Sequence, residues 1–190
     1  MKSTLIATLF CMCSMDMAAK EQETDATAPA PLKALTTIAA LDVPRYMGTW
    51  YEIAKFPNRF QRKCVGYTKA QYSPMADGHV KVLNRCMLES GEMNEAIGAA
   101  KQVGAPTSPK LKVRFAPAWL SFIPLVWGDY WVIDLDDNYE LAAVSEPSRD
   151  YLWILSRTPK VDPKSYESLL RRLAGKGFDV QKLEVTRQGN

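Results

Sequence analysis

The chain has 190 residues, of which 47% are hydrophobic and 24% charged, and its net charge is +3. This is the composition of an ordinary globular protein, and the length allows one domain of common size preceded by a processed segment. The basic residues are scattered, which argues against a nucleic-acid-binding protein. No stretch approaches the ~18 uninterrupted apolar residues that are typical of a transmembrane helix.

The N-terminus shows the order of regions of a secretory signal peptide. A lysine precedes an apolar run at residues 5–13, and small residues suited to cleavage end at Ala19. Cys11 and Cys13 each follow a bulky residue, whereas a lipoprotein signal normally has a small residue before the cysteine that carries lipid. We predict a signal peptide at 1–19 and a periplasmic or outer-membrane location, with the lipid anchor left open. The alternative is a short buried or disordered N-terminus in a cytosolic protein.

Residues 20–40 come next and are rich in Ala, Thr and Pro, with no aromatic residue. This composition indicates a flexible tether. We therefore expect the folded domain to cover residues 41–186, followed by a short tail at 187–190.

Two cysteines, Cys64 and Cys86, remain after the predicted leader is removed. An even number in an exported protein favours a disulfide. A tight turn at Asp77-Gly78 would pair Cys64 with a position near 91, whereas a longer loop centred near Met75 would bring the two cysteines together. The strand register therefore permits the bridge without requiring it.

Short segments with β-branched and aromatic residues follow one another from Trp50 onward, separated by turn residues. We predict strands at Trp50–Phe56, Val65–Tyr72, Val80–Cys86, Asn94–Lys101, Lys110–Phe115, Tyr130–Leu135, Tyr139–Val144 and Tyr151–Ser156. Lys110–Phe115 alternates most cleanly, with three apolar residues on one face and three cations on the other. Strands at this spacing indicate an antiparallel sandwich or a closed barrel.

One amphipathic helix is predicted after these strands. Asp162 suits the N-cap and Pro163 the first turn, and Gly175 suits the end of the helix. Apolar residues between them recur at helical spacing and form a single stripe. We expect this stripe to pack on the outside of the β-structure, and we expect one more short strand between Phe178 and Val185.

Three stretches together carry a family resemblance. They are GTWYEIAKFPNRFQ (Gly48–Gln61), GDYWVIDLD (Gly128–Asp136) and DYLWILSRTP (Asp150–Pro159). In this order they resemble the lipocalin family, in particular its bacterial outer-membrane branch related to apolipoprotein D, over residues 41–185. The resemblance implies an all-β fold: an eight-stranded antiparallel up-and-down barrel, or calyx, with the C-terminal helix packed on its outside.

The resemblance also implies how one end of the barrel is sealed. Trp50 would plug the closed end, Arg157 would stack on its indole as a cation–π pair, and Gly48 would let the preceding short helix approach closely. These three residues are expected to be structural.

A ligand site in the open half of the barrel is a further implication of the resemblance. The cargo in this branch is a fatty acid or lysophospholipid, carried or stored in the cell envelope. If Arg157 points inward, the period of two places Leu155, Trp153 and Tyr151 on the same inner face; the alternative is that the aromatic side chains fill the lumen. The predicted lining of the calyx and rim is Trp153, Tyr151, Leu155, Phe115, Trp119, Phe122 and Tyr130.

Residues 115–128 contain no charged side chain, although they connect two predicted strands. Such a connection is normally polar and exposed, and an exposed apolar patch usually marks a binding surface. We consider three interpretations: a lid or portal of the lipid site, a contact with a membrane surface or a second copy in a homodimer, and a loop folded onto its own barrel.

Other classes of function have weaker support in the sequence. An enzyme on the same barrel, of the isomerase or de-epoxidase type, is the main alternative, but the sequence contains no catalytic triad, metal-ligand cluster or glycine-rich phosphate loop. His79 is the single histidine and a poor candidate for a pigment ligand. Asp134 and Asp136 lie two apart at a strand end, where we expect both to be solvated. We therefore predict a non-enzymatic protein with no metal and no cofactor.

Overall fold

The structure is a computed structural model that describes residues 33–189. The predicted signal peptide at 1–19 and most of the predicted tether at 20–40 lie outside these residues. A four-residue helix, α1 (Val43–Tyr46), precedes the first strand.

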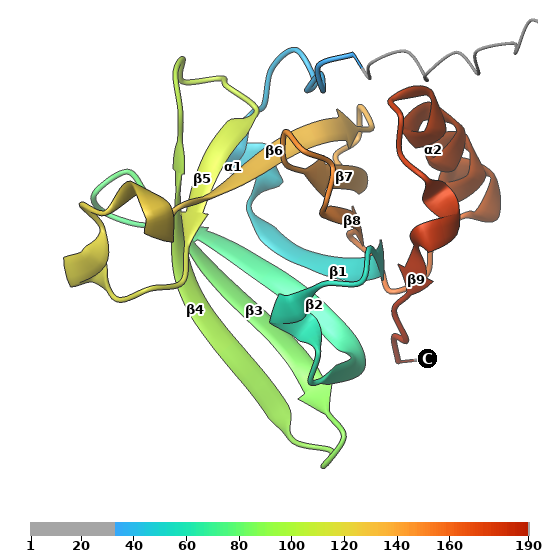
Figure 1. Cartoon of the computed structure of the whole chain (residues 1–190), viewed down its shortest axis with the longest axis horizontal. Helices are drawn as coiled ribbons and strands as arrows, with labels where there is room; N and C mark the ends of the chain where they lie inside the picture. The colour runs from blue at the N-terminus through green and yellow to red at the C-terminus, as the bar shows by residue number, and fades with distance from the viewer. Residues whose placement is uncertain (1–32, 190) are drawn as a thin grey trace, which may run out of the picture. The chain divides into compact units, whose positions relative to one another are not determined.

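The described part of the chain forms a closed antiparallel barrel (Figure 1). Each strand from β1 to β7 pairs with the next along the chain, and β1 also pairs with β8, which closes the sheet. This arrangement confirms the predicted up-and-down barrel and excludes the sandwich. A further strand, β9, pairs with the end of β1. The strands are β1 (Gly48–Lys55), β2 (Cys64–Pro74), β3 (Val80–Leu88), β4 (Met93–Gln102), β5 (Lys110–Arg114), β6 (Gly128–Leu135), β7 (Leu141–Ser145), β8 (Leu152–Ser156) and β9 (Glu184–Val185).

Alternation in each strand decides which side chains face the interior, because successive residues point to opposite faces. Bulges in β1 and β6 interrupt this alternation. The bulges turn a different set of side chains outward. Ala54, which follows the bulge in β1, and Ile133, which lies in the bulge of β6, are therefore buried against the helix and not in the interior.

Helix α2 (Pro163–Gly175) lies on the outside of the barrel, as predicted (Figure 1). Asp162 is its N-cap and accepts a hydrogen bond from the backbone N–H of Ser165. Leu169 and Leu173 are completely buried against the outer faces of β7 and β8. The helix ends at Gly175, as predicted, and Lys176 is its C-cap. Gly177 has a φ of +87° and turns the chain out of the helix, which is a conformation that favours glycine.

The packed region extends beyond the predicted boundaries at both ends. On the N-terminal side Leu35 is buried and the N–H of Ile38 donates to the carbonyl of Val132. On the C-terminal side the amide of Gln188 donates to the carbonyls of Glu52 and Thr68, which belong to β1 and β2. The last residues therefore bridge these two strands where their own pairing has ended.

Candidate functional site

Strand register separates an inner from an outer surface of the barrel wall. Directly paired residues share a face, and Trp50 opposite Ala70, Leu155 opposite Ala142, and Trp153 opposite Val144 are such pairs. Their side chains belong to one apolar cluster on the inner face of the wall, whereas a second cluster lies between the wall and α2. The inner cluster includes Leu41, Tyr46, Trp50, Tyr72, Val82, Leu111, Val132, Val144 and Leu155.

One end of the barrel is sealed by Trp50 and Arg157. Trp50 has no exposed surface, and its indole Nε1 donates to the carbonyl of Tyr46 at 2.9 Å. The guanidinium carbon of Arg157 lies 3.9 Å from the centroid of the indole, which is the geometry of a cation–π pair. The same guanidinium donates to the carbonyls of Arg45, Met47, Thr49 and Tyr139.

Gly48 is required at this end for two reasons. Its φ is +97°, and a Cβ atom at this position would lie 3.3 Å from a guanidinium nitrogen of Arg157. A larger residue would therefore strain the backbone and press on the cation.

Three tyrosines form a polar cluster just above the sealed end. The hydroxyl of Tyr130 lies 3.0 Å from that of Tyr46 and 3.0 Å from that of Tyr72. Burial raises the pKa of all three phenols, that of Tyr72 to about 12, so the hydroxyls stay protonated at neutral pH. The three hydroxyls carry three protons but form only two hydrogen bonds with one another. One O–H group therefore has no acceptor among the described side chains. Of the three, only Tyr130 was predicted as a site residue.

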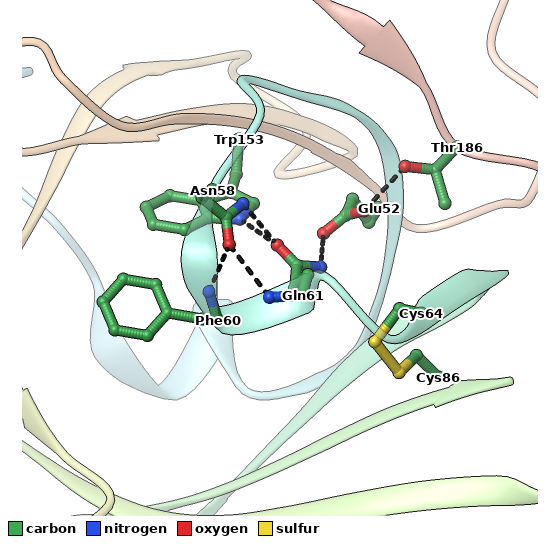
Figure 2. Close-up of a disulfide and its surroundings, with 8 residues drawn as sticks. All are labelled: Glu52, Asn58, Phe60, Gln61, Cys64, Cys86, Trp153 and Thr186. Carbon is green, nitrogen blue, oxygen red and sulfur yellow. Dashed lines mark hydrogen bonds between the residues drawn. A yellow bond between two sulfur atoms is a disulfide. The ribbon is translucent and has the colours of Figure 1, made fainter. Parts of the chain in front are cut away.

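At the other end, Trp153 is held by the turn that follows β1 (Figure 2). Its indole Nε1 donates to Oε1 of Gln61 at 2.9 Å, and Asn58 donates to the same oxygen at 2.9 Å. Tyr151 stacks on Trp153 with ring centroids 5.8 Å apart, and Phe60 packs against Tyr151 at 5.4 Å. The predicted pair Trp153 and Tyr151 thus meets at the rim, together with a phenylalanine and a glutamine that sequence analysis missed.

Glu52 lies beneath this turn and links it to the C-terminal segment (Figure 2). Its carboxylate accepts hydrogen bonds from Nε2 of Gln61 at 2.5 Å and from the hydroxyl of Thr186 at 2.6 Å. Burial raises the pKa of Glu52, although these two hydrogen bonds and the charge of Lys55 act against that rise. Glu52 was not predicted as a site residue, although alternation from Trp50 places it on the inner face of β1.

The predicted disulfide between Cys64 and Cys86 is present, with Cα atoms 5.6 Å apart (Figure 2). Cys64 is paired in register with Leu88, so the bridge runs diagonally between β2 and β3. Bulges near Gly66 shift the register of β2 against β3. This shift brings Cys64 close to Cys86, although regular pairing from the turn onward would place Cys64 opposite a later residue of the chain. The bridge fixes β2 directly after the turn that carries Gln61.

The remaining predicted site residues lie on the connection between β5 and β6. Phe115 directly follows β5 and packs over Gly98 of β4, where its ring leaves no room for a side chain. Trp119 and Phe122 are 72% and 77% exposed, so they are not part of the packed lining. The structure therefore brings together Trp153, Tyr151, Leu155 and Tyr130 on the barrel interior and rim, but not these two.

Asp134 corrects one expectation of the sequence. It is buried, and both of its carboxylate oxygens accept hydrogen bonds from Arg172 of α2 at 2.8 Å. It therefore fixes the helix to the wall instead of being solvated. Asp136 caps the following turn by accepting from the N–H groups of Glu140 and Leu141.

Hollows of about 430 Å³ and 350 Å³ lie outside the barrel wall. One is lined by residues of the N-terminal segment, the end of β6 and α2, and the other by Phe56, Arg149 and Lys182 among others. The residues that face the barrel interior are therefore assigned from the strand register and from their burial, not from these hollows. Within residues 33–189 there is no cluster of three acidic, histidine or cysteine residues suited to a metal ion. No helix in the same range is long and apolar enough to cross a membrane.

These features define a barrel that is closed at one end by an indole–guanidinium stack and lined by apolar and aromatic side chains. The sequence matches the model of the Lipocalin-like domain over residues 41–188. The chain belongs to this family.

Sequence relatives place the chain more closely within the family. It is 41% identical to temperature-induced lipocalin-1 of Arabidopsis thaliana over 83% of this chain and 85% of that protein. It is also 41% identical to the outer membrane lipoprotein Blc of Escherichia coli K12, over 82% and 84% of the two chains. Apolipoprotein D of Mus musculus is 34% identical over 78% of each. The last two matches confirm the predicted branch.

A solved structure agrees on the fold. Insecticyanin from the tobacco hornworm Manduca sexta superposes with a TM-score of 0.64 at 19% identity, over 86% of this chain and 89% of that one. At this identity the likeness concerns the fold alone.

Proposed function

We propose that this protein binds a small apolar molecule inside the barrel and carries or stores it in the cell envelope, without catalysing a reaction on it. The observation that carries the proposal is the inner surface itself. It is sealed by Trp50 at one end and presents the half-buried Trp153 near the other. Apolar burial of this kind favours an oily guest over a charged one.

Fatty acids and lysophospholipids are the ligand classes that we propose. Both have a hydrocarbon chain suited to the inner cluster, and both have oxygen atoms that accept hydrogen bonds. The unassigned hydroxyl proton of the Tyr46–Tyr130–Tyr72 cluster is one donor for such an oxygen. Gln61, at the rim, already binds the indole of Trp153 and so fixes one wall of the entrance.

The envelope location is supported by two observations. The N-terminal sequence has the order of a signal peptide, and a relative of similar length is named an outer membrane lipoprotein. Self-association of the protein into a homodimer remains a prediction that was made from the sequence.

The first test is to purify the full-length chain without detergent, extract it with organic solvent and identify bound lipids by mass spectrometry. We expect a fatty acid or lysophospholipid. Incubation with fatty-acid derivatives should leave them unchanged. A protein that is empty as purified and that also fails to bind added fatty acid would refute the proposal.

Two tryptophans on opposite faces of the wall provide a matched comparison. Trp153 faces the interior, whereas Trp131 lies outside, where Nζ of Lys110 is 4.2 Å from its ring centroid. Trp153→Ala should weaken binding of a fluorescent fatty acid by roughly tenfold or more, because it removes a large apolar contact. Trp131→Ala should leave the affinity unchanged. Equal effects of the two substitutions would contradict binding in the interior.

A further inference from the structure

The connection between β5 and β6 presents three apolar side chains to solvent at a spacing of three residues. Trp119, Phe122 and Leu125 are 72%, 77% and 94% exposed. We call these three residues the apolar tip. Patches of this kind on a soluble domain usually mark a contact surface.

The apolar tip is carried by an ordered backbone. Two short 3₁₀ turns, Ala118–Leu120 and Pro124–Val126, form the connection. Five N–H groups of the connection donate to carbonyls three residues earlier, namely those of Leu120, Ser121, Ile123, Val126 and Trp127. These backbone hydrogen bonds give the connection a defined conformation from which the exposed side chains project.

Trp127 fixes the end of this connection to the outer face of the barrel. Its indole N–H donates to the carbonyl of Ser121 at 2.8 Å. Nζ of Lys101 lies 4.4 Å from its ring centroid, and the guanidinium carbon of Arg114 lies 5.2 Å from it. The ring of His79 stacks beside it at 6.4 Å. The connection therefore lies against the wall at Trp127 and projects at the apolar tip.

Arg114 is an unusual cation. It is 9% exposed, its Nη1 donates to the carbonyl of Ala116, and its Nε is buried without a hydrogen-bond partner. Neither Arg114 nor Lys101 forms an ion pair with any carboxylate of residues 33–189. A buried charge without a counter-charge is costly, so this position favours an anion supplied from outside.

Cross-strand register extends the positive charge along the same face. Arg114 is paired with Ala99, and Lys101 with Lys112, so these cations lie on one outer surface of β4 and β5. Lys110 lies further along β5 on that surface. Two carboxylates are nearby: Asp129 pairs with Lys112 at 2.8 Å, and Asp77 lies 3.1 Å from His79. We call Lys101, Lys110, Lys112 and Arg114 the cationic face.

We propose that the apolar tip and the cationic face together dock this protein on the surface of a bilayer that contains anionic phospholipid. Aromatic and aliphatic side chains enter the boundary between head groups and acyl chains, and Lys and Arg beside them bind lipid phosphates. The tip is a projection of three highly exposed apolar side chains. It therefore suits a soft lipid surface better than a protein partner, which would need a matching pocket.

The test is flotation of the full-length chain with vesicles of phosphatidylcholine alone and with vesicles in which about a third of the lipid is phosphatidylglycerol. We expect binding to the anionic vesicles that weakens as salt is raised. Replacing the apolar tip by serine (Trp119→Ser, Phe122→Ser, Leu125→Ser) should reduce binding by roughly a hundredfold. Lys101→Gln with Lys110→Gln should reduce it by about fivefold for each charge removed.

Matched controls come from exposed residues on other parts of the barrel. Val65 and Val185 are 47% and 76% exposed, and Val65→Ser with Val185→Ser should leave vesicle binding unchanged. Lys164→Gln with Lys182→Gln is the corresponding charge control. If the triple variant does not fold, Leu125→Ser alone tests the same surface, because this side chain is almost fully exposed.

Several results would overturn the proposal. The first is a wild-type protein that does not float with anionic vesicles. The second is an apolar-tip variant that floats as well as the wild type. A tip variant that loses self-association in sedimentation, with vesicle binding unaffected, would assign the surface to a second copy of the chain. Extraction of a lipid from the barrel interior is independent of all these outcomes, so it tests the proposed cargo separately.

Discussion

Replacing Trp50 tests the sealed end of the barrel most directly. The side chain is completely buried, donates one hydrogen bond to Tyr46 and lies beneath the guanidinium of Arg157. A buried tryptophan removes about 150–250 Å² from water, which corresponds to about 4–6 kcal/mol at ~25 cal/mol per Å². This is an upper estimate, because the unfolded chain already buries part of that surface.

We therefore expect Trp50→Ala to lower the free energy of unfolding by about 3–5 kcal/mol, in line with large-to-small substitutions in other cores. About 1–2 kcal/mol of this reflects the cation–π contact, since Arg157 keeps its four carbonyl acceptors. Urea unfolding followed by circular dichroism measures the change. Trp119→Ala is the control, and its effect should stay within about 0.5 kcal/mol because the residue is exposed.

A loss below about 1 kcal/mol for Trp50→Ala would refute the argument, since no core substitution of this size is so mild unless the cavity collapses. Trp50→Phe keeps a ring and provides a milder variant if the alanine form does not fold. A double-mutant cycle of Trp50→Leu with Arg157→Gln isolates the pairwise energy, because each substitution removes one partner of the cation–π contact. Additive effects would show that the stack contributes nothing beyond burial.

Three further predictions concern the bridge, the rim and the tyrosine cluster. Reducing the Cys64–Cys86 disulfide, whose cysteines are 22 residues apart, should cost about 3 kcal/mol in urea unfolding; an unchanged midpoint would contradict it. Burial raises the pKa of Glu52, so its contribution to stability is full below the unfolded pKa and is lost as pH rises through the folded pKa. Glu52→Gln should therefore gain stability relative to wild type as the pH rises above the unfolded pKa of this carboxyl, and a constant difference would exclude this titration. Tyr130→Phe should lower stability by about 1–3 kcal/mol, because it leaves two buried hydroxyls without their partner; calorimetry that shows no loss would argue against the cluster.

Much of the fold follows from short-range patterns in the sequence. Alternation marked the strands, and Asp162 with Pro163 marked the start of α2 to the residue. The fold family followed from three longer motifs, since alternation alone left a sandwich and a barrel equally open. Trp153, Leu155 and Tyr130 could be placed on the inner face because they lie on regular stretches of strand.

Other features depend on contacts that no local pattern reveals. The burial of Asp134 requires Arg172, which lies on a helix that the strand pattern does not position. Arg114 has the pattern of an exposed residue and is buried only because the connection after β5 folds back over it. The hydroxyl cluster joins Tyr46 and Tyr72 through Tyr130 across three separate elements. Each of these three features depends on contacts between residues far apart in the sequence, so the local sequence pattern did not reveal it.

The way in which the barrel closes has a consequence for its synthesis. β1 emerges first but finds one of its partners only in β8, and the seam beside it is completed by Gln188 near the end of the chain. An unpaired strand edge invites association with other chains, and distant partners make closure slow. The nascent protein therefore carries an open edge until β8 and the segment around Gln188 have been made, so shielding by a chaperone during translation should favour its yield.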